Sequence, residues 1–402
     1  MKILMLGWEL PPNNSGGLGI ACYQLCRALS KKNISIDFIL PYQANHDIDF
    51  MEVIAAKPHG VASVQRSGIA YDSYKYVMED GGEEWLNIYD QQYLYEHAGG
   101  GGGGEREFDI VHAHDWLTFR AALRAKEISG KPLIAHVHSL ESDRSGKEFG
   151  GNPLVREIEE TTLLLADRII AVSELTKRTI HREYAIPLDK IDVVHNNFDQ
   201  ELMIPEQGPN AYTYLTQLKR KGYRVVSNVG RITIQKGLPN LLQAFRIVME
   251  YAPKTMLLIA GAGEQYYELI TLAAELGIAR NVVFADFQRG KGYRDTFTIA
   301  DLFFVPSISE PFAITALEAV VYNVPVLVSK QTGVSEVIRN FLKVDFWDIH
   351  EMANQITGVM QNEVLGAELE RNAHREYECL SWDHAADKVQ ALYGRHAETV
   401  RL

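Results

Sequence analysis

Short apolar runs alternate with longer amphipathic segments along the first half of the chain. Residues 2–6 and 34–40 are apolar, and residues 20–29 between them have the periodicity of a helix. Short continuous apolar runs are typical of strands buried on both faces of a parallel sheet, and helices connect such strands. The order therefore predicts a doubly wound α/β sheet. Further apolar runs continue it at residues 110–113, 133–137, 168–172 and 191–194.

A second series of the same kind follows residues 197–222, where the periodicity is weak. Val225 and Val226 begin this series, and helical patterns separate its later members, which predicts a second, similar sheet. A chain of 402 residues is also long for one hydrophobic core, so we predict two domains, residues 1–203 and 204–379. The later runs lie at residues 256–260, 282–285, 302–305 and 325–328, before a last helical pattern at residues 382–393.

Charge and cysteine content narrow the functional classes. The net charge of -12 argues against nucleic acid or an anionic membrane as the main partner, because both are bound by clustered Lys and Arg. No apolar run approaches the ~20 residues of a membrane span, and three cysteines are too few for a disulfide framework. We therefore expect a cytoplasmic chain without an integral membrane segment. The sequence carries no sign of an oligomeric state. Six consecutive glycines, residues 99–104, predict a flexible linker.

Two glutamates lie near the start of a predicted helix that follows the run at residues 302–305. Glu310 and Glu318 are eight residues apart, and Pro311 suits a first helical turn. With both glutamates in one helix they would be ~12 Å apart, which exceeds the ~5 to 9.5 Å between the carboxylates of a glycosidase. The span suits the two ends of an extended ligand. The structural alternative is a solvated Glu318 and a Glu310 that interacts with the helix dipole.

The loop after the first strand of the second domain carries two cations. Arg231 and Lys236 lie five residues apart between Gly230 and Gly237. Both can reach one diphosphate, and a charge pair at ~4 Å with an effective dielectric near 20 contributes ~4 kcal/mol before desolvation. Such a loop can stabilise a departing nucleoside diphosphate without a metal. Two solvated surface cations are the alternative.

Glycine-rich turns follow two other predicted strands. The loop Ser-Gly-Gly-Leu-Gly at residues 15–19 precedes a helix, so its backbone amides can approach an anion. Gly17, Gly19 and Asp37 partly match a dinucleotide-binding fingerprint, but Cys22 occupies the third glycine position. A plain flexible loop is the alternative. Gly261 begins another close-approach turn after residues 256–260.

Histidines end two predicted strands of the first domain. Alternation along a strand puts His112 and His114 on one face, and likewise His136 and His138. Such pairs can hold a metal, so a metal-dependent hydrolase is an alternative function. The sequence has no further ligand motif such as HExxH or CxxC. We therefore expect hydrogen-bonded structural histidines and no metal.

Taken together, these segments resemble the family-4 glycosyltransferases with the GT-B fold, and within them the glycogen and starch synthase-like bacterial branch. The most specific matches are the Glu310/Glu318 spacing, the loop from Gly230 to Gly237, and His112-Ala-His114-Asp115-Trp116. The resemblance covers nearly the whole chain. It implies two Rossmann-like domains that face across a cleft, and a final helix, residues 380–402, that crosses back to the first domain.

The resemblance also implies an activity. This activity is retaining, metal-independent transfer of a hexosyl group, glucosyl in this branch, from a nucleoside diphosphate sugar to a glycan or other hydroxyl acceptor, without a cofactor. Within it, Glu318 would bind the ribose and Glu310 the transferred sugar. The implied catalytic residues are Glu310, His138, Arg231 and Lys236. The implied donor-binding residues are Gly17, Arg231, Lys236, Gly261, Phe312, Ala313, Ile314 and Glu318, and the implied acceptor-side residues are Asp115, His114 and Trp116.

Three positions depart from the family pattern, among them Asp286, which replaces a glycine common before residues 287–290. Ala313 stands where the motif usually has Gly, which changes how the backbone approaches the sugar. Asn14 stands where ADP-glucose-dependent glycogen synthases carry Lys, which argues against ADP-glucose as the donor. A sugar-nucleotide-binding protein with little transfer activity is therefore a further hypothesis, and a dinucleotide oxidoreductase is another.

Overall fold

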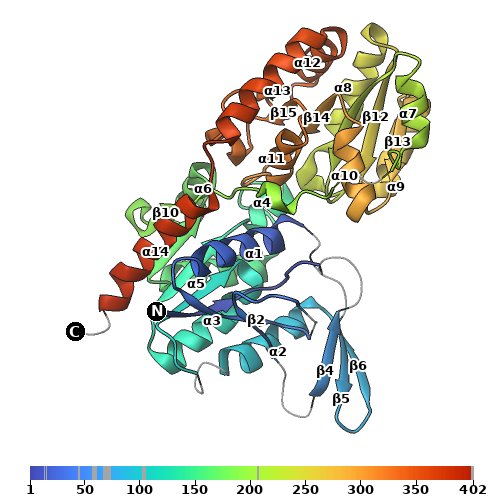
Figure 1. Ribbon diagram of the computed structural model, residues 1–402. Coiled ribbons are helices and arrows are strands. Elements are labelled where there is room, and N and C mark those ends of the chain that lie inside the picture. Colours follow the sequence, from blue (N-terminus) through green and yellow to red (C-terminus); the bar gives the residue numbers. More distant parts are fainter. Residues whose placement is uncertain are drawn as a thin grey trace. The chain divides into compact units, whose positions relative to one another are not determined.

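Figure 1 shows a computed structural model of the chain. It describes residues 1–12, 14, 16–43, 46–56, 61–66, 74–101, 106–205 and 208–399. Two compact units are present. The first comprises Met1–Glu141, Gly151–Asn196 and Trp382–Leu402, and the second comprises Ser142–Gly150 and Asn197–Ser381.

The first unit contains a seven-stranded parallel sheet in the order β10-β9-β8-β7-β1-β2-β3. Every residue of β7 and β8 is buried, which explains their continuous apolar character. The strands are β1 (Lys2–Leu6), β2 (Ser35–Leu40), β3 (Glu52–Ala55), β7 (Ile110–His114), β8 (Leu133–Val137), β9 (Arg168–Ala171) and β10 (Ile191–Val193). The helices are α1 (Gly17–Ser30), α2 (Ile88–Gly101), α3 (Trp116–Ser129), α5 (Pro153–Leu165), α6 (Glu174–Tyr184) and α14 (Trp382–Thr399). The short α4 (Glu141–Ser145) belongs to the second unit except for its first residue.

The last helix, α14, is part of the first unit although it follows the second in sequence. The Trp382 indole donates a hydrogen bond to the Gln24 side chain, and Tyr393 Oη lies 2.5 Å from His112 Nδ1. These contacts tie α14 to α1 and to the buried strand β7.

A small antiparallel sheet in the first unit has no counterpart in the predicted pattern. It consists of β4 (Val61–Arg66), β5 (Tyr74–Met78) and β6 (Glu83–Leu86), in that order. Exposed residues interrupt β6, so it produces no continuous apolar run. Helix α2 continues to Gly101, so the predicted linker is wrong for residues 99–101, while residues 102–104 lie outside the described part of the chain.

The second unit contains a six-stranded parallel sheet in the order β13-β12-β11-β14-β15-β16. Side chains of α8 and α12 share one buried core with this sheet, including Phe245, Phe304 and Ile356. The strands are β11 (Arg224–Val229), β12 (Thr255–Ala260), β13 (Val282–Ala285), β14 (Leu302–Val305), β15 (Val326–Ser329) and β16 (Leu342–Val344). The helices are α7 (Thr213–Lys219), α8 (Leu238–Tyr251), α9 (Tyr266–Glu275), α10 (Gly290–Thr298), α11 (Ile314–Val321), α12 (Ile349–Gln361) and α13 (Glu363–Tyr377). The prediction of two parallel α/β sheets is thus confirmed.

Each sheet has a point where the order of strand addition reverses. In the first unit it lies between β1 and β7, and in the second between β11 and β14. Ligands of open α/β sheets bind beyond the carboxyl ends of the strands at such a point. A ligand site is therefore expected in the loops after these four strands.

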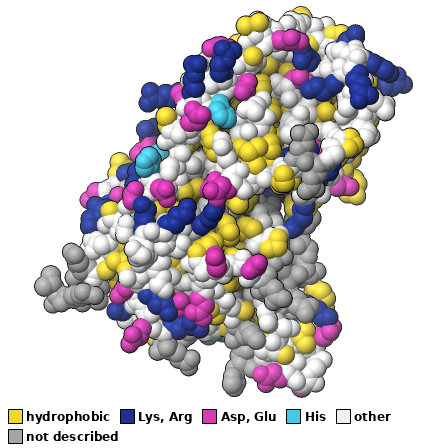
Figure 2. Space-filling view, in the orientation of Figure 1, with side chains coloured by type: hydrophobic (Ala, Val, Ile, Leu, Met, Phe, Trp, Pro, Cys, Tyr) yellow, Lys and Arg dark blue, Asp and Glu magenta, His cyan; other side chains and the backbone are white. Residues whose placement is uncertain are grey.

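The surface has no single dominant sign of charge on the face shown in Figure 2. Lys and Arg side chains are interspersed there with Asp and Glu. Among the described residues, no helix combines the length and the apolar character needed to cross a membrane.

Candidate functional site

The loop that carries Arg231 follows β11 and rests on the turn after β12. The amide of Gly230 donates to the carbonyl of Ala260 over 3.0 Å, and the amide of Ile232 donates to that of Ala262 over 2.9 Å. A Cβ on Gly261 would lie 1.8 Å from the carbonyl oxygen of Gly230, so no larger residue fits there. Gly261 thus supports the backbone that presents Arg231, which is half-buried.

The same loop continues to Lys236 and joins the loop after β14. Gly237 adopts φ 64°, and a Cβ on it would lie 2.3 Å from the carbonyl oxygen of Pro306. The amide of Ile308 donates to the carbonyl of Gln235 over 2.8 Å. The two loops at the β11/β14 switch point are therefore one connected structure.

Glu310 and Lys236 form an ion pair across these loops. Lys236 Nζ lies 2.5 Å from Glu310 Oε2, which also accepts a hydrogen bond of 2.9 Å from the Ser307 hydroxyl. The side chains are 21% and 11% exposed, so water screens the pair only weakly. The sequence indicated both charged residues but gave no sign that Ser307 would contact Glu310.

Glu310 lies before the helix and not within it. Its amide donates to the carbonyl of Gln331 over 2.9 Å, and its carbonyl accepts from the amide of Gly333 over 2.9 Å, so its backbone is extended. Helix α11 begins at Ile314. The predicted helix start at Pro311 is therefore wrong, because backbone pairing with the segment after β15 takes the place of the first helical turn.

Glu318 lies in the middle of α11 and is buried. Its Oε2 accepts a hydrogen bond of 2.7 Å from the hydroxyl of Tyr293, which is half-buried on α10. Burial raises the pKa of Glu318 to about 7, and the hydrogen bond from Tyr293 acts in the opposite direction. A solvated Glu318 was the structural alternative, and it is wrong. A carboxylate kept in such a place at an electrostatic cost is typical of a functional group.

Ala313 connects the two glutamates through an unusual backbone conformation. It has φ 72° and ψ 71°, in the left-handed region, and its neighbours Phe312 and Ile314 are also buried. Glycine adopts this conformation without strain, whereas an L residue does so at a cost of roughly 1–2 kcal/mol. The backbone conformation here is therefore one that suits the glycine usual in the family, and Ala313 adopts it under strain.

Replacing Ala313 with Gly is expected to stabilise the second unit by about 1 kcal/mol, because it removes this strain. Ala316→Gly is the matched control. Ala316 is buried in α11 with helical backbone, so its replacement should destabilise by about 1 kcal/mol. Urea unfolding monitored by circular dichroism measures both. Equal destabilisation by the two changes would contradict the account.

In the first unit, four histidines form one block at the ends of β7 and β8. The rings of His112 and His114 stack at 4.7 Å, and those of His136 and His138 at 4.3 Å, as strand alternation predicts. His114 Nδ1 lies 2.9 Å from His138 Nε2, and His112 Nε2 lies 3.2 Å from His136 Nδ1. Burial lowers the pKa of His112 and of His138 to about 3. These imidazoles are neutral near pH 7, so His138 offers a hydrogen bond and not a positive charge.

Asp115 fixes the position of His138. Its Oδ1 accepts hydrogen bonds from the amides of His138 over 2.6 Å and Ser139 over 3.2 Å. Asp115 has φ 61° in the turn between β7 and α3, which an L residue adopts only under strain. Trp116 begins α3 and is buried, with its ring 6.2 Å from that of Tyr89. The predicted acceptor-side residues His114, Asp115 and Trp116 are consecutive in the chain and span the turn from β7 to α3.

The glycine-rich loop leads into α1, which begins at the exposed Gly17. Gly17 therefore lies at the start of a 14-residue helix, where backbone amides favour an anion. Asp37 pairs with Lys2 Nζ over 2.8 Å and with Arg106 over 3.3 Å, and its side chain is 3% exposed. The Asp37 carboxylate is therefore occupied by ion pairs within the protein. It does not serve as the ribose ligand that a dinucleotide oxidoreductase would need.

Comparisons with known proteins agree with these observations. The family model described as Glycosyltransferase Family 4 matches residues 15–202, and the one described as Glycosyl transferases group 1 matches residues 216–376. An uncharacterised glycosyltransferase of Methanocaldococcus jannaschii is 28% identical over 407 residues, with 98% of each chain covered. A D-inositol 3-phosphate glycosyltransferase of Mycobacterium marinum is 30% identical over 304 residues, which cover 72% of this chain and 64% of the relative.

The comparison with solved structures shows the fold. Sucrose-phosphate synthase from Thermosynechococcus elongatus superposes with a TM-score of 0.75 at 17% identity, with 98% of both chains covered. This likeness shows the GT-B fold. The chain belongs to the family-4 glycosyltransferases.

Proposed function

We propose that this glycosyltransferase moves a hexosyl group, which we expect to be glucosyl, from a nucleoside diphosphate sugar to a hydroxyl acceptor. The anomeric configuration is retained, and neither a metal nor a cofactor takes part. The observation that carries the proposal is the weakly solvated Lys236/Glu310 pair at the β11/β14 switch point, with Glu318 buried in the same loop and helix segment.

Lys236 and Arg231 are the groups that we assign to the diphosphate. In the transfer, the bond between the anomeric carbon and the diphosphate oxygen breaks, and a bond from the acceptor oxygen forms. The acceptor proton leaves with the nucleoside diphosphate. Negative charge grows on the leaving group, and fixed cations in a poorly solvated loop stabilise it more than water does. Glu310 holds Lys236 in place and faces the transferred sugar.

Glu318 is assigned to the ribose hydroxyls, and Tyr293 positions it. A carboxylate can accept two hydroxyl hydrogen bonds, and charge-assisted bonds of this kind are the stronger ones. In the first unit, the neutral His138 is assigned to a sugar hydroxyl and Gly17 to the phosphates. Asp115, His114 and Trp116 are assigned to the acceptor side.

The acceptor is a glycan or a smaller hydroxyl compound. The relative from Mycobacterium marinum is named for D-inositol 3-phosphate, so a phosphorylated polyol belongs among the candidates beside glycogen. Membership of the family disfavours the metal-dependent hydrolase. The hypothesis of a binding protein with little transfer activity was based on Ala313 in place of Gly. Because Ala313 adopts the backbone conformation that glycine would have, this basis is removed.

The test is a nucleotide-release panel. UDP-, ADP- and GDP-glucose are each incubated with the chain and EDTA, alone and with glycogen or D-inositol 3-phosphate. The proposal expects release from at least one donor to rise with an acceptor, and proton NMR of the first product to show the configuration of the donor. An inverted product or activity abolished by EDTA would refute the proposed mechanism.

A further inference from the structure

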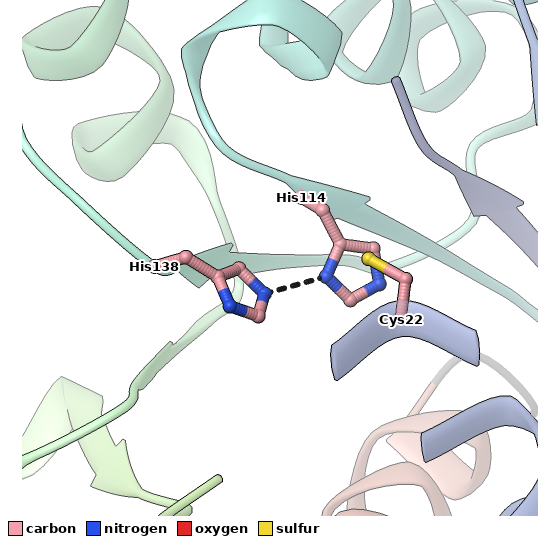
Figure 3. A group of neighbouring side chains, drawn as sticks. All are labelled: Cys22, His114 and His138. Carbon is pink, nitrogen blue, oxygen red and sulfur yellow. Dashed lines mark hydrogen bonds between the residues drawn. The ribbon is translucent and has the colours of Figure 1, made fainter. Parts of the chain in front are cut away.

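Cys22 lies beside the histidine block of the first unit. It is a buried residue of α1, and His114 and His138 come from the ends of β7 and β8. One possible ligand atom from each of the three residues lies within 4.8 Å of the other two. In Figure 3 the thiol and the two imidazoles point toward one another. Three separate elements thus bring a sulfur and two nitrogen donors to one place.

From this arrangement, we propose that Cys22, His114 and His138 bind a soft divalent cation such as Zn²⁺, and that the bound cation inhibits the transferase. Zn²⁺ prefers thiolate and neutral imidazole ligands, at ~2.3 Å for sulfur and ~2.0 Å for nitrogen. In a tetrahedral site these lengths separate the ligand atoms by roughly 3.5 Å. The donors are within 4.8 Å, so a closure of about 1 Å through side-chain rotation completes a three-ligand site.

The surroundings favour a cation here. Burial raises the pKa of the Cys22 thiol most, and the charges of Cys26, Asp115 and Glu9 nearby raise it further. The same charges attract a cation. Met5 Sδ lies 3.0 Å from His114 Nε2, so a further soft atom borders the group. The Asp115 carboxylate also holds the backbone of His138, which fixes one ligand.

A second histidine group, His112, His114 and His136, is less suited to a cation. Its three residues are fully buried and neutral, so no negative charge in the group offsets the two positive charges of a bound divalent cation. The Cys22 group contains a thiol that can become a thiolate, and His138 is only partly buried, which leaves a path for entry. Because both groups share His114, one cation excludes the other.

Binding is balanced by the loss of one proton. His114 Nδ1 and His138 Nε2 now share one hydrogen-bonding proton. When both nitrogens bind Zn²⁺, this proton moves to the second nitrogen of its own ring, and both imidazoles stay neutral. The Cys22 thiol releases its proton to solvent, which leaves one thiolate and two neutral nitrogens on the metal. Affinity for Zn²⁺ therefore rises with pH.

Inhibition follows from the ligand role of His138, and this step rests on the proposed function. An imidazole nitrogen bound to Zn²⁺ cannot also hydrogen-bond a sugar hydroxyl, and the added charge changes the field at the reacting carbon. Cys22 has no assigned part in transfer.

Calorimetric titration of Zn²⁺ into the full chain tests the site directly. All variants carry Cys379→Ser, because Cys379 is an exposed thiol. Cys26→Ser is the matched control, since Cys26 is a buried thiol one turn further along α1. We expect one tight Zn²⁺ equivalent in the parent and in Cys26→Ser. Cys22→Ser should bind at least about tenfold more weakly. Co²⁺ in place of Zn²⁺ should show a thiolate-to-metal charge-transfer band that Cys22→Ser lacks.

Two outcomes would overturn the site: equal Zn²⁺ affinity in Cys22→Ser, or Mg²⁺ binding as tightly as Zn²⁺. Cys22→Ala and a thermal melt of each variant guard against misfolding. In the transfer assay, Zn²⁺ should inhibit the parent and Cys26→Ser and spare Cys22→Ser. If no donor in the nucleotide-release panel supports transfer, the calorimetry still shows whether Cys22, His114 and His138 bind Zn²⁺. Equal inhibition of Cys22→Ser would refute the link to transfer.

Discussion

Replacing Lys236 with Ala is expected to lower kcat/KM for sugar transfer by about 10²- to 10³-fold, since a fixed charge that faces the leaving group contributes on this scale. Lys236 is held 2.5 Å from Glu310 in a loop built on Gly237 and Gly261, so it needs little reorganisation when charge develops. Nucleotide release with saturating acceptor measures the effect. Turnover within threefold of the parent would remove Lys236 from the mechanism.

The same change leaves Glu310 without its cation, so a structural effect must be separated from a catalytic one. The double variant Lys236→Ala/Glu310→Gln removes both charges and should recover most of the stability lost in the single variant, but none of the activity. Lys330→Ala is the surface control. Lys330 pairs with Asp345 over 2.8 Å and is 55% exposed, so turnover should stay within about twofold of the parent.

Replacing Glu318 with Gln is expected to change stability and donor binding in opposite directions. The folded-state pKa of about 7 lies above the ordinary 4.5, so the ionised carboxylate destabilises the fold as the pH rises through this range. Gln removes the charge and can still accept the hydrogen bond from Tyr293. Above about pH 8 the variant should be more stable by up to about 3 kcal/mol, and near pH 5 the difference should largely vanish.

Donor affinity should fall in the same variant by about 10- to 100-fold, because a neutral amide is a weaker acceptor for ribose hydroxyls. The affinity of the parent should rise with pH through about 7, as Glu318 ionises. Tyr293→Phe removes the hydrogen bond that lowers this pKa, so the midpoint should move to higher pH. Glu275→Gln, on the exposed end of α9, is the control and should change neither property. Unaltered donor affinity in Glu318→Gln would end the ribose assignment.

The sequence predicts the parts of this molecule that depend on local pattern. Strands buried on both faces, such as β7, produce apolar runs that can be found directly, and Arg231 and Lys236 stand out because two glycines bracket them. Strands β3, β4, β5, β6 and β16 have no counterpart among the predicted runs; exposed side chains interrupt the apolar pattern of β6, and β16 is only three residues long. Local pattern thus suffices for most strands of the two parallel sheets and for the charged residues at the second switch point.

Other properties of the site depend on tertiary contacts. The burial of Glu318 and its bond from Tyr293 join residues 25 positions apart, and no spacing indicates that contact. The left-handed backbone of Ala313 cannot be predicted from the sequence either, because the local preference of alanine is for a right-handed helix. The extended backbone of Glu310 depends on pairing with Thr332, which the helix prediction from Pro311 could not include.

We propose that the second unit binds a nucleoside diphosphate without a metal, through Lys236 and Glu318. Calorimetric titration of UDP, ADP and GDP into the full chain in EDTA tests it most directly, since it needs no acceptor and no known sugar. At least one of the three nucleotides should bind, and Lys236→Ala and Glu318→Gln should each weaken its binding by about tenfold or more while Lys330→Ala should not. Failure of all three to bind, or equal binding by every variant, would contradict it.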